Sequence, residues 1–208
     1  CAYPVLGDMK LYQNYHAKHH AWTQTEKDPD LLLTKHYPVS LTSMLRKFAR
    51  DISGVTGVRQ IRDRLVDLLD NPDVSTVDKV NNLWRNIGGG VSINFMCFCV
   101  FLVSGLGWAY FWLWLVPLLT WHQVVLRVRN IAEHALLTED SKNVFRQART
   151  TIASGLERIL IAPYWVNYHL EHHLFPTAPC YNLPQVRAFL IENGFEKDLE
   201  TEESYLAV

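Results

Sequence analysis

The longest feature of the hydrophobic pattern is a run from Ile87 to Leu126 that contains no Asp, Glu, Lys or Arg over 40 residues. One helix needs about 20 apolar residues to cross a bilayer. The run therefore predicts two membrane-spanning helices, at roughly residues 87–104 and 107–126. The alternative is a buried hairpin in a soluble protein, which a charge-free run of this length disfavours.

Small residues and aromatic rings give the predicted hairpin its turn and its borders. A turn is expected where small residues cluster, at Ser104, Gly105 and Gly107. Trp and Tyr rings favour the headgroup level of a bilayer. Such rings open the second predicted helix, and one more lies near its far end: Trp108, Tyr110, Trp112, Trp114 and Trp121. Pro117 is expected to kink this second helix.

Basic residues border the run on both sides, with Arg85 before it and Arg127 and Arg129 after it. Because a two-helix hairpin returns the chain to its starting side, both flanks share one compartment. The positive-inside rule predicts that this compartment is the cytoplasm.

In residues 40–70 the apolar residues are spaced by polar ones and do not form a continuous apolar run. Apolar residues recur there at helical spacing: Val55, Val58, Ile61, Leu65, Leu68 and Leu69. Three arginines lie between them. The pattern predicts one amphipathic helix, either at the membrane surface or on an ordinary cytoplasmic domain. Asn71-Pro72-Asp73 is expected to end it. The acidic segment from Glu192 to Glu203 is expected to be solvated.

Composition narrows the function classes. The 208 residues carry a formal net charge of -1, whereas nucleic-acid-binding proteins usually have a basic excess, so no nucleic-acid partner is expected. The four cysteines form no CxxC pair, so neither a disulfide framework nor a thiolate metal site is predicted. Six of the nine histidines lie in two windows of five residues.

Those windows are two copies of His-x-x-His-His, at residues 16–20 and 169–173. On an α-helix, positions i, i+3 and i+4 fall within about 100° of one another, so each copy should place three imidazoles on one helical face. Neutral imidazole is a good ligand for Fe, Zn, Cu and Ni. The copies therefore predict metal binding by His16, His19, His20, His169, His172 and His173.

Asn130 and His134 follow the predicted hairpin and share one helical face, so they are candidate ligands of the same site. Seven histidines exceed one tetrahedral site and suggest two metals. The zinc-hydrolase pattern His-Glu-x-x-His is absent from the sequence. Two imidazole-bound irons that activate dioxygen suit the count. A lone His36 or His122 is more often structural, so neither is included.

Carboxylates close to these histidines are candidates to accept the second imidazole N–H, as they do in many metal sites. They are Asp28, Asp30, Glu133 and Glu171. Each could equally be an ordinary surface carboxylate.

At these residues the sequence resembles the membrane fatty acid desaturase family, the histidine-box di-iron enzymes, over most of its length. The segments that carry the resemblance are Tyr15–His20, Asp28–Asp30, the hairpin, Asn130–His134 and Asn167–Pro176. Tyr181–Pro184 also looks like bacterial members. The order and spacing of the histidine boxes make the resemblance specific.

The resemblance implies an all-α integral membrane bundle with a cytoplasmic helical cap that carries the histidine boxes. Residues 1–208 would form one desaturase-like domain, with a cytoplasmic cap at 1–86, a hairpin at 87–126 and a second cytoplasmic region at 127–208. The full protein would have four spans. A further box, His-x(3–4)-His, is expected upstream of Cys1, and the chain without it is expected to be inactive.

The resemblance also implies chemistry. The seven histidines would bind two non-heme iron ions. Asn130 matches a family position close to one iron, where the side chain often contacts the metal through a water. The implied reaction is O2-dependent desaturation of a fatty acyl chain on a lipid, CoA or acyl carrier protein, in a bacterial inner membrane. Because the sequence has no Rossmann fingerprint and no cysteine cluster, ferredoxin or a cytochrome b5-type protein would supply electrons.

Two alternatives stay open. A hydroxylase or ketolase acting on alkyl, sphingolipid or carotenoid substrates would use the same metal motif. A non-catalytic membrane protein that binds metal would also carry clustered histidines.

Overall fold

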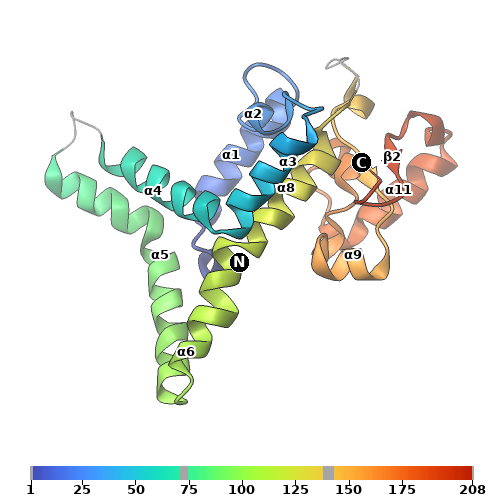
Figure 1. The fold of residues 1–208 in the computed structure, drawn as a ribbon. Helices are drawn as coiled ribbons and strands as arrows, with labels where there is room; N and C mark the ends of the chain where they lie inside the picture. The colour runs from blue at the N-terminus through green and yellow to red at the C-terminus, as the bar shows by residue number, and fades with distance from the viewer. Residues whose placement is uncertain (1, 71–74, 138–142, 208) are drawn as a thin grey trace. The chain divides into compact units, whose positions relative to one another are not determined.

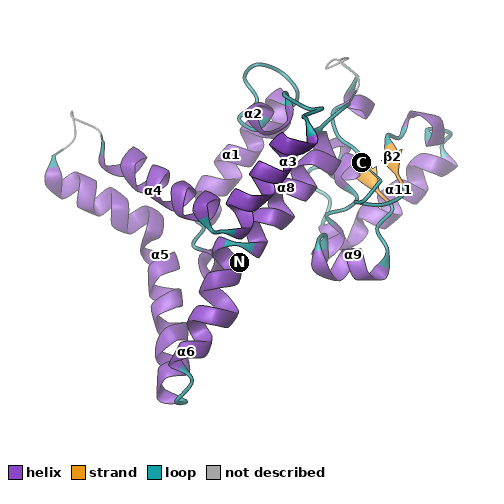
Figure 2. Ribbon diagram, viewed as in Figure 1, coloured by secondary structure: helices purple, strands orange, loops and turns teal. Residues whose placement is uncertain are grey.

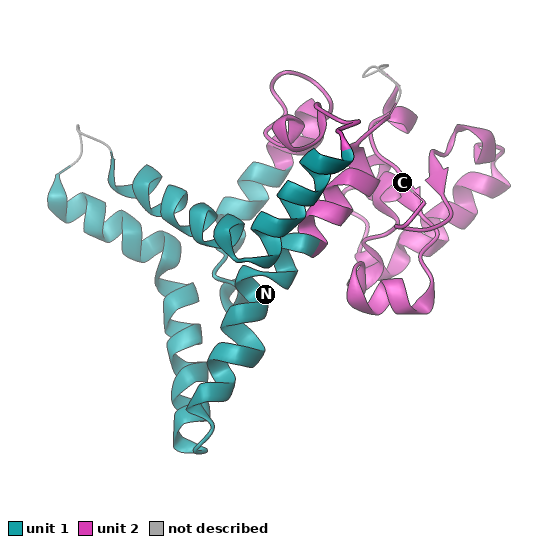
Figure 3. Ribbon diagram, viewed as in Figure 1, with its two compact units in different colours: residues 1–16, 41–124 teal, residues 17–40, 125–208 magenta. Residues whose placement is uncertain are grey.

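The computed structural model describes residues 2–70, 75–137 and 143–207. The chain divides into two compact units (Figure 3). Unit 1 comprises Cys1–His16 and Leu41–Val124, and unit 2 comprises Ala17–Ser40 and Val125–Val208. The regular secondary structure of the described residues is almost entirely helical (Figure 2), and strand occurs only as a short pair in unit 2. The expected all-α class is thus confirmed, apart from this pair.

Figure 1 shows the helices of the described residues and labels most of the α-helices. The α-helices are α1 (Met9–Trp22), α2 (Leu31–Thr34), α3 (Leu41–Ile52), α4 (Val55–Leu69), α5 (Thr76–Val103), α6 (Gly107–Tyr110), α7 (Val116–Leu119), α8 (Trp121–His134), α9 (Gly155–Leu160), α10 (His169–Leu174) and α11 (Leu183–Glu192). Short 3-10 helices cover Tyr3–Val5, Val144–Arg146, Pro163–Trp165, Cys180–Asn182 and Glu196–Asp198. The strands are β1 (Thr150–Thr151) and β2 (Thr201–Glu202).

Unit 1 contains the predicted hairpin. Helix α5 begins at Ser75, whose hydroxyl accepts the backbone N–H of Asp78 as an N-cap. It ends at Val103, and Gly105 supplies the turn with φ of 72°, a conformation that glycine adopts at little cost. The second long helix then starts at Gly107. The turn lies where the small residues predicted it.

Two helices are long and apolar enough to cross a membrane, Thr76–Val103 and Gly107–His134, each of 28 residues. Both extend beyond the predicted limits, because a helix continues into charged sequence once its backbone hydrogen bonds are formed. Only 17% of the most apolar window of each helix is buried in the structure. The core helix of a soluble protein would be mostly buried, so this exposure favours membrane-spanning helices over a buried hairpin.

The second long helix, Gly107–His134, comprises α6, α7 and α8 and is irregular before Pro117. Residues Phe111–Leu115 form a π-helical turn, and Pro117 occupies the first turn of α7. A proline ring cannot fit against the carbonyl of residue i−4 in a regular α-helix, and it has no N–H to donate. The irregularity therefore lies at the position where the proline predicted it.

Asn94 is a buried polar residue in the hairpin of unit 1. Its Nδ2 donates to the carbonyl oxygens of Tyr3 at 3.2 Å and Gly90 at 2.8 Å. Its Oδ1 accepts from the Tyr110 hydroxyl at 3.0 Å and from Trp114 Nε1 at 3.1 Å. A buried amide without partners would be costly. Asn94 instead joins the two long helices and the N-terminal 3-10 helix.

The prediction of one amphipathic helix over residues 40–70 is wrong in one respect. The segment forms two helices, α3 and α4, separated at Gly54, which has φ of 79°. A residue with left-handed backbone angles cannot continue a right-handed helix, so the chain changes direction between α3 and α4. Helix α4 ends at Leu69. The predicted stop signal, Asn71-Pro72-Asp73, lies outside the described residues.

Unit 2 holds a short parallel sheet in which Thr150 pairs with Thr201 and Thr151 with Glu202. Its small cores include Leu170, Leu190 and Leu199 in one cluster, and Ala132, Ala153, Ala162 and Tyr205 in another. The expectation of a solvated acidic tail is therefore wrong for part of that segment. Leu199 is buried, and Glu200 pairs with Arg146.

Gly57 provides a test of packing in unit 1. A Cβ at this position would lie 2.7 Å from the carbonyl oxygen of Leu119 and 3.0 Å from its Cα. Backbone atoms cannot yield as a flexible side chain does. We expect Gly57→Ala to lower the free energy of unfolding by about 1–3 kcal/mol, despite the higher helix propensity of alanine. Thermal unfolding in detergent measures the effect.

The matched control is Gly155→Ala, because a Cβ at Gly155 would meet no atom within 4 Å. This variant should melt at or above the wild-type temperature. Equal melting temperatures for the two variants would contradict the close approach of α4 and α7.

Candidate metal centre

Three helices carry the predicted histidines of unit 2. Helix α1 carries His19 and His20, and α8 ends at His134. Helix α10 begins at His169 and also holds His172 and His173. On α10 the i, i+3 and i+4 spacing places the three rings within about 100° of one another around the helix. The structure thus brings together segments that lie more than 100 residues apart in sequence.

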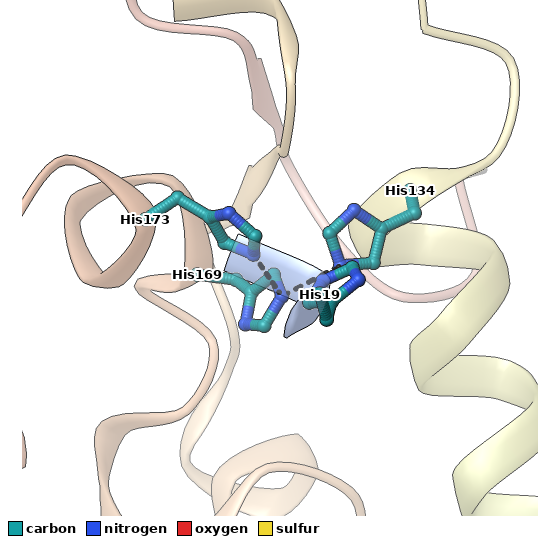
Figure 4. A group of neighbouring side chains, drawn as sticks. All are labelled: His19, His134, His169 and His173. Atoms are coloured by element: carbon teal, nitrogen blue, oxygen red, sulfur yellow. Dashed lines mark hydrogen bonds between the residues drawn. The ribbon is translucent and has the colours of Figure 1, made fainter. Parts of the chain in front are cut away.

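Four of these rings meet at one point, and Figure 4 shows them directed toward one another. The Nε2 atoms of His19 and His134 lie 3.2 Å apart, and those of His134 and His169 lie 2.8 Å apart. The Nε2 atom of His173 lies 3.2 Å from that of His169. The ligand atoms of all four lie within 4.8 Å of one another.

The other ring nitrogens determine what these Nε2 atoms can do. His134 Nδ1 lies 3.1 Å from the carbonyl oxygen of Gln147. A carbonyl oxygen only accepts, so Nδ1 carries the proton. His19 Nδ1 donates in the same way to the Asp28 carboxylate at 2.8 Å. In the neutral rings of His19 and His134, each Nε2 atom is therefore a bare acceptor.

Acceptor nitrogens that face one another repel unless a proton or cation lies between them. Around an ion about 2.0–2.1 Å from each imidazole nitrogen, neighbouring ligand nitrogens lie about 2.8–3.4 Å apart. The observed separations of 2.8 Å and 3.2 Å fall in this range. The chemistry and spacing of the donors therefore fit a transition-metal ion.

Burial keeps the ligands neutral. It lowers the pKa values of His169 and His173 well below the ordinary value, and neighbouring imidazoles, His134 first among them, lower both further. Burial alone would raise the pKa of Asp28. The hydrogen bond from His19, with those from the backbone N–H groups of Asp30 and Gln24, lowers it below its usual value. At neutral pH this gives uncharged rings at His169 and His173 and an ionised acceptor behind His19.

A second group lies beside the first. The Nε2 atoms of His20 and His172 are 3.0 Å apart, and the His20 ring stacks on His173 with centroids 4.2 Å apart. His16 lies one helical turn before His20 on α1, as the last residue of unit 1. Each histidine box thus divides its rings between two groups. The spacing alone could not predict this division.

The remaining predicted residues have different surroundings. Asn130 is half-buried on α8, one turn before His134. Asp30 lies 3.5 Å from His19 Nδ1, and Glu133 lies 3.7 Å from His169 Nδ1. Glu171 is fully buried, and its carboxylate accepts from Thr150 and Arg187. His36 is exposed, and His122 lies on α8 within unit 1.

Several residues around the rings were not predicted from sequence. The Gln147 carbonyl that orients His134 is a backbone group and leaves no signal in the side-chain pattern. Arg129 donates two hydrogen bonds to Glu133, at 2.8 Å and 3.2 Å. Their i, i+4 spacing could have suggested this pair.

The Asp28–His19 hydrogen bond generates a prediction. Asp28→Asn removes the charge that stabilises the Nδ1 proton of His19, so that ring becomes a weaker ligand. We expect metal affinity to fall about 10–100-fold, as is typical for carboxylates behind metal-bound histidines. Metal retained after dialysis against graded chelator measures this. Glu26→Gln, at an exposed acidic residue two positions away, is the control. Equal metal retention by both variants would contradict a role for Asp28.

Comparisons with known proteins agree with this geometry. A family model described as "Fatty acid desaturase" matches residues 1–200. A curated relative, dihydrorhizobitoxine desaturase of Bradyrhizobium elkanii, is 35% identical over 86 residues. The match covers 40% of this chain and 24% of the relative, so the chain spans much less than the whole length of that protein.

Proposed function

This chain belongs to the fatty acid desaturase family of oxidoreductases, and from that premise we propose that the intact protein desaturates a fatty acyl chain with dioxygen at a non-heme di-iron centre. One observation carries the proposal. The buried Nε2 atoms of His19 and His134, both acceptors, face each other at 3.2 Å, an arrangement that calls for a proton or a cation between them. The Nε2 atom of His169 lies 2.8 Å from that of His134 and supplies a third ligand atom.

Two groups of histidines suit two irons. His19, His134, His169 and His173 form the group that would hold one ion. For the second we propose His20 and His172, together with His16 from the same face of α1 and Asn130, directly or through a water. Asp28, Asp30 and Glu133 would orient the rings from behind. Nitrogen ligands of this kind suit iron, whereas the soft thiolates that favour Cu(I) are absent from both boxes.

Bound iron would supply the oxidant for unactivated C–H bonds, which no amino-acid side chain can oxidise. Removing two hydrogen atoms from adjacent carbons, with two electrons and two protons from outside, reduces one O2 to two waters and leaves a double bond. The chain's own residues would hold the ligands in place and keep the buried rings away from water.

The rest of the chain supports proposals for the location, the substrate and the electron source. The two long apolar helices support a membrane location. We propose a bacterial inner membrane with the histidines on the cytoplasmic side, the side that the positive-inside rule assigns to the basic flanks of the hairpin. We propose a lipid-bound acyl chain as the substrate. The two electrons would come from an external donor, ferredoxin or a cytochrome b5-type protein.

A second candidate comes from the curated relative, which is named for dihydrorhizobitoxine. The intact protein could desaturate that compound or one like it.

Mass spectrometry of the reaction products separates acyl desaturation from the alternatives. Loss of two hydrogens from an added fatty acyl substrate supports acyl desaturation. Oxygen added without a new alkene would instead identify a hydroxylase or ketolase. One equivalent of zinc with no oxygen consumption would indicate a non-catalytic metal-binding protein.

Single substitutions test the ligand assignment. His19→Ala and His172→Ala each remove a ring from one histidine group, so we expect both to abolish desaturation and to lower iron content. His36→Ala alters an exposed histidine and should change activity little. Product formation and iron per chain are measured for all three in the full-length protein. Equal losses in the three variants would contradict the assignment.

A further inference from the structure

We propose that a buried link between Glu171 and Arg187, together with the segment 147–151, holds the histidines of α8 and α10 in their binding positions before metal arrives. The inference rests on the metal site proposed above. It assigns Glu171 and Arg187 as positioning residues, and it replaces the expectation that Glu171 hydrogen-bonds directly to an imidazole.

The segment 147–151 first fixes the end of α8. The last carbonyl groups of a helix have no partner within the helix. The backbone N–H of Arg149 donates to the Glu133 carbonyl at 2.9 Å, and Arg149 Nη1 donates to the Ala132 carbonyl at 3.2 Å. The Gln147 carbonyl then accepts from His134 Nδ1 at 3.1 Å. One short segment therefore caps α8 and sets the orientation of its histidine ring.

The same segment also holds α10. The Thr150 hydroxyl donates to one oxygen of Glu171, and Arg187 Nη1 donates to the other at 2.7 Å. On an α-helix Glu171 lies about 200° around the axis from His169 and from His173. The carboxylate thus connects α10 to Thr150 and Arg187 on the face opposite those two rings. It fixes the rotation of the helix and hence the direction of its imidazoles.

The C-terminal segment supports this arrangement from behind. The Thr150 N–H donates to the Glu200 carbonyl at 3.0 Å, and the Ile152 N–H donates to the Glu202 carbonyl at 2.7 Å. Arg187 Nη2 donates to the Thr201 hydroxyl at 2.9 Å. Arg187 therefore joins α10, α11 and β2 through one guanidinium, whose two-pronged geometry a lysine could not reproduce.

Burial makes this link sensitive to substitution. The Glu171 side chain is 0% exposed and that of Arg187 is 15% exposed. Removing one partner of a buried ion pair leaves an uncompensated charge, which is strongly destabilising, whereas removing both charges is often tolerated. The informative variants are therefore Arg187→Lys, Arg187→Met and the neutral double variant Glu171→Gln/Arg187→Met.

The experiment titrates the metal-free full-length protein in detergent with Co²⁺, below its melting temperature. The readouts are Co²⁺ affinity and the visible absorption spectrum of bound Co²⁺, which reports ligand number. We expect affinity to fall at least about 10-fold in Arg187→Met and in the double variant, with an altered spectrum. Arg187→Lys should recover part of the affinity. The control is Arg62→Met, because Arg62 pairs with Asp63 on the exposed surface, where the two side chains are 68% and 59% exposed.

The outcomes separate the two proposals. If the double variant has a lower melting temperature but unchanged Co²⁺ affinity and spectrum, the link only stabilises the fold. That result would overturn this inference and leave the proposed di-iron function standing. If the wild-type protein itself binds no Co²⁺ or iron, the proposed di-iron function fails before the variants are compared.

Discussion

The convergence of imidazole nitrogens on one buried point is the constraint that organises unit 2. The Nδ1–H groups of His134 and His19 donate hydrogen bonds to the Gln147 carbonyl oxygen and to the Asp28 carboxylate, so the Nε2 atoms of both rings face inward as acceptors. Without a cation these atoms repel one another, and they would turn apart if the helices were free to rotate. Hydrogen bonds from neighbouring segments oppose such a rotation. Arg149 caps α8, and a buried carboxylate holds α10 from its opposite face.

The helical hairpin was the most predictable part of the fold. A charge-free run and a cluster of small residues sufficed to place the turn at Gly105, because both signals are local. The limits of the helices were less predictable, since backbone hydrogen bonding continues past the apolar stretch to Thr76 and to His134. The break at Gly54 was missed because the hydrophobic spacing continues across it, although a glycine at that point was a visible signal.

The site was predictable in its ligand types but not in its arrangement. Repeated His-x-x-His-His spacing predicted imidazoles on helical faces, yet which ring joins which group depends on how α1 and α10 are rotated toward each other. That rotation is set by contacts distant in sequence. The sequence offered Glu171 only as a neighbour of two histidines, whereas its role depends on Thr150 and Arg187, which come from other segments. Tertiary contacts of this kind have no periodic signature in the sequence.

The most direct test of the central claim is X-ray diffraction from iron-loaded crystals of the full-length protein, recorded on both sides of the iron absorption edge. The account predicts an anomalous peak among the Nε2 atoms of His19, His134, His169 and His173, with the His134 Nδ1 atom still hydrogen-bonded to Gln147. Iron bound through Nδ1 atoms, or found only outside this group of rings, would contradict it.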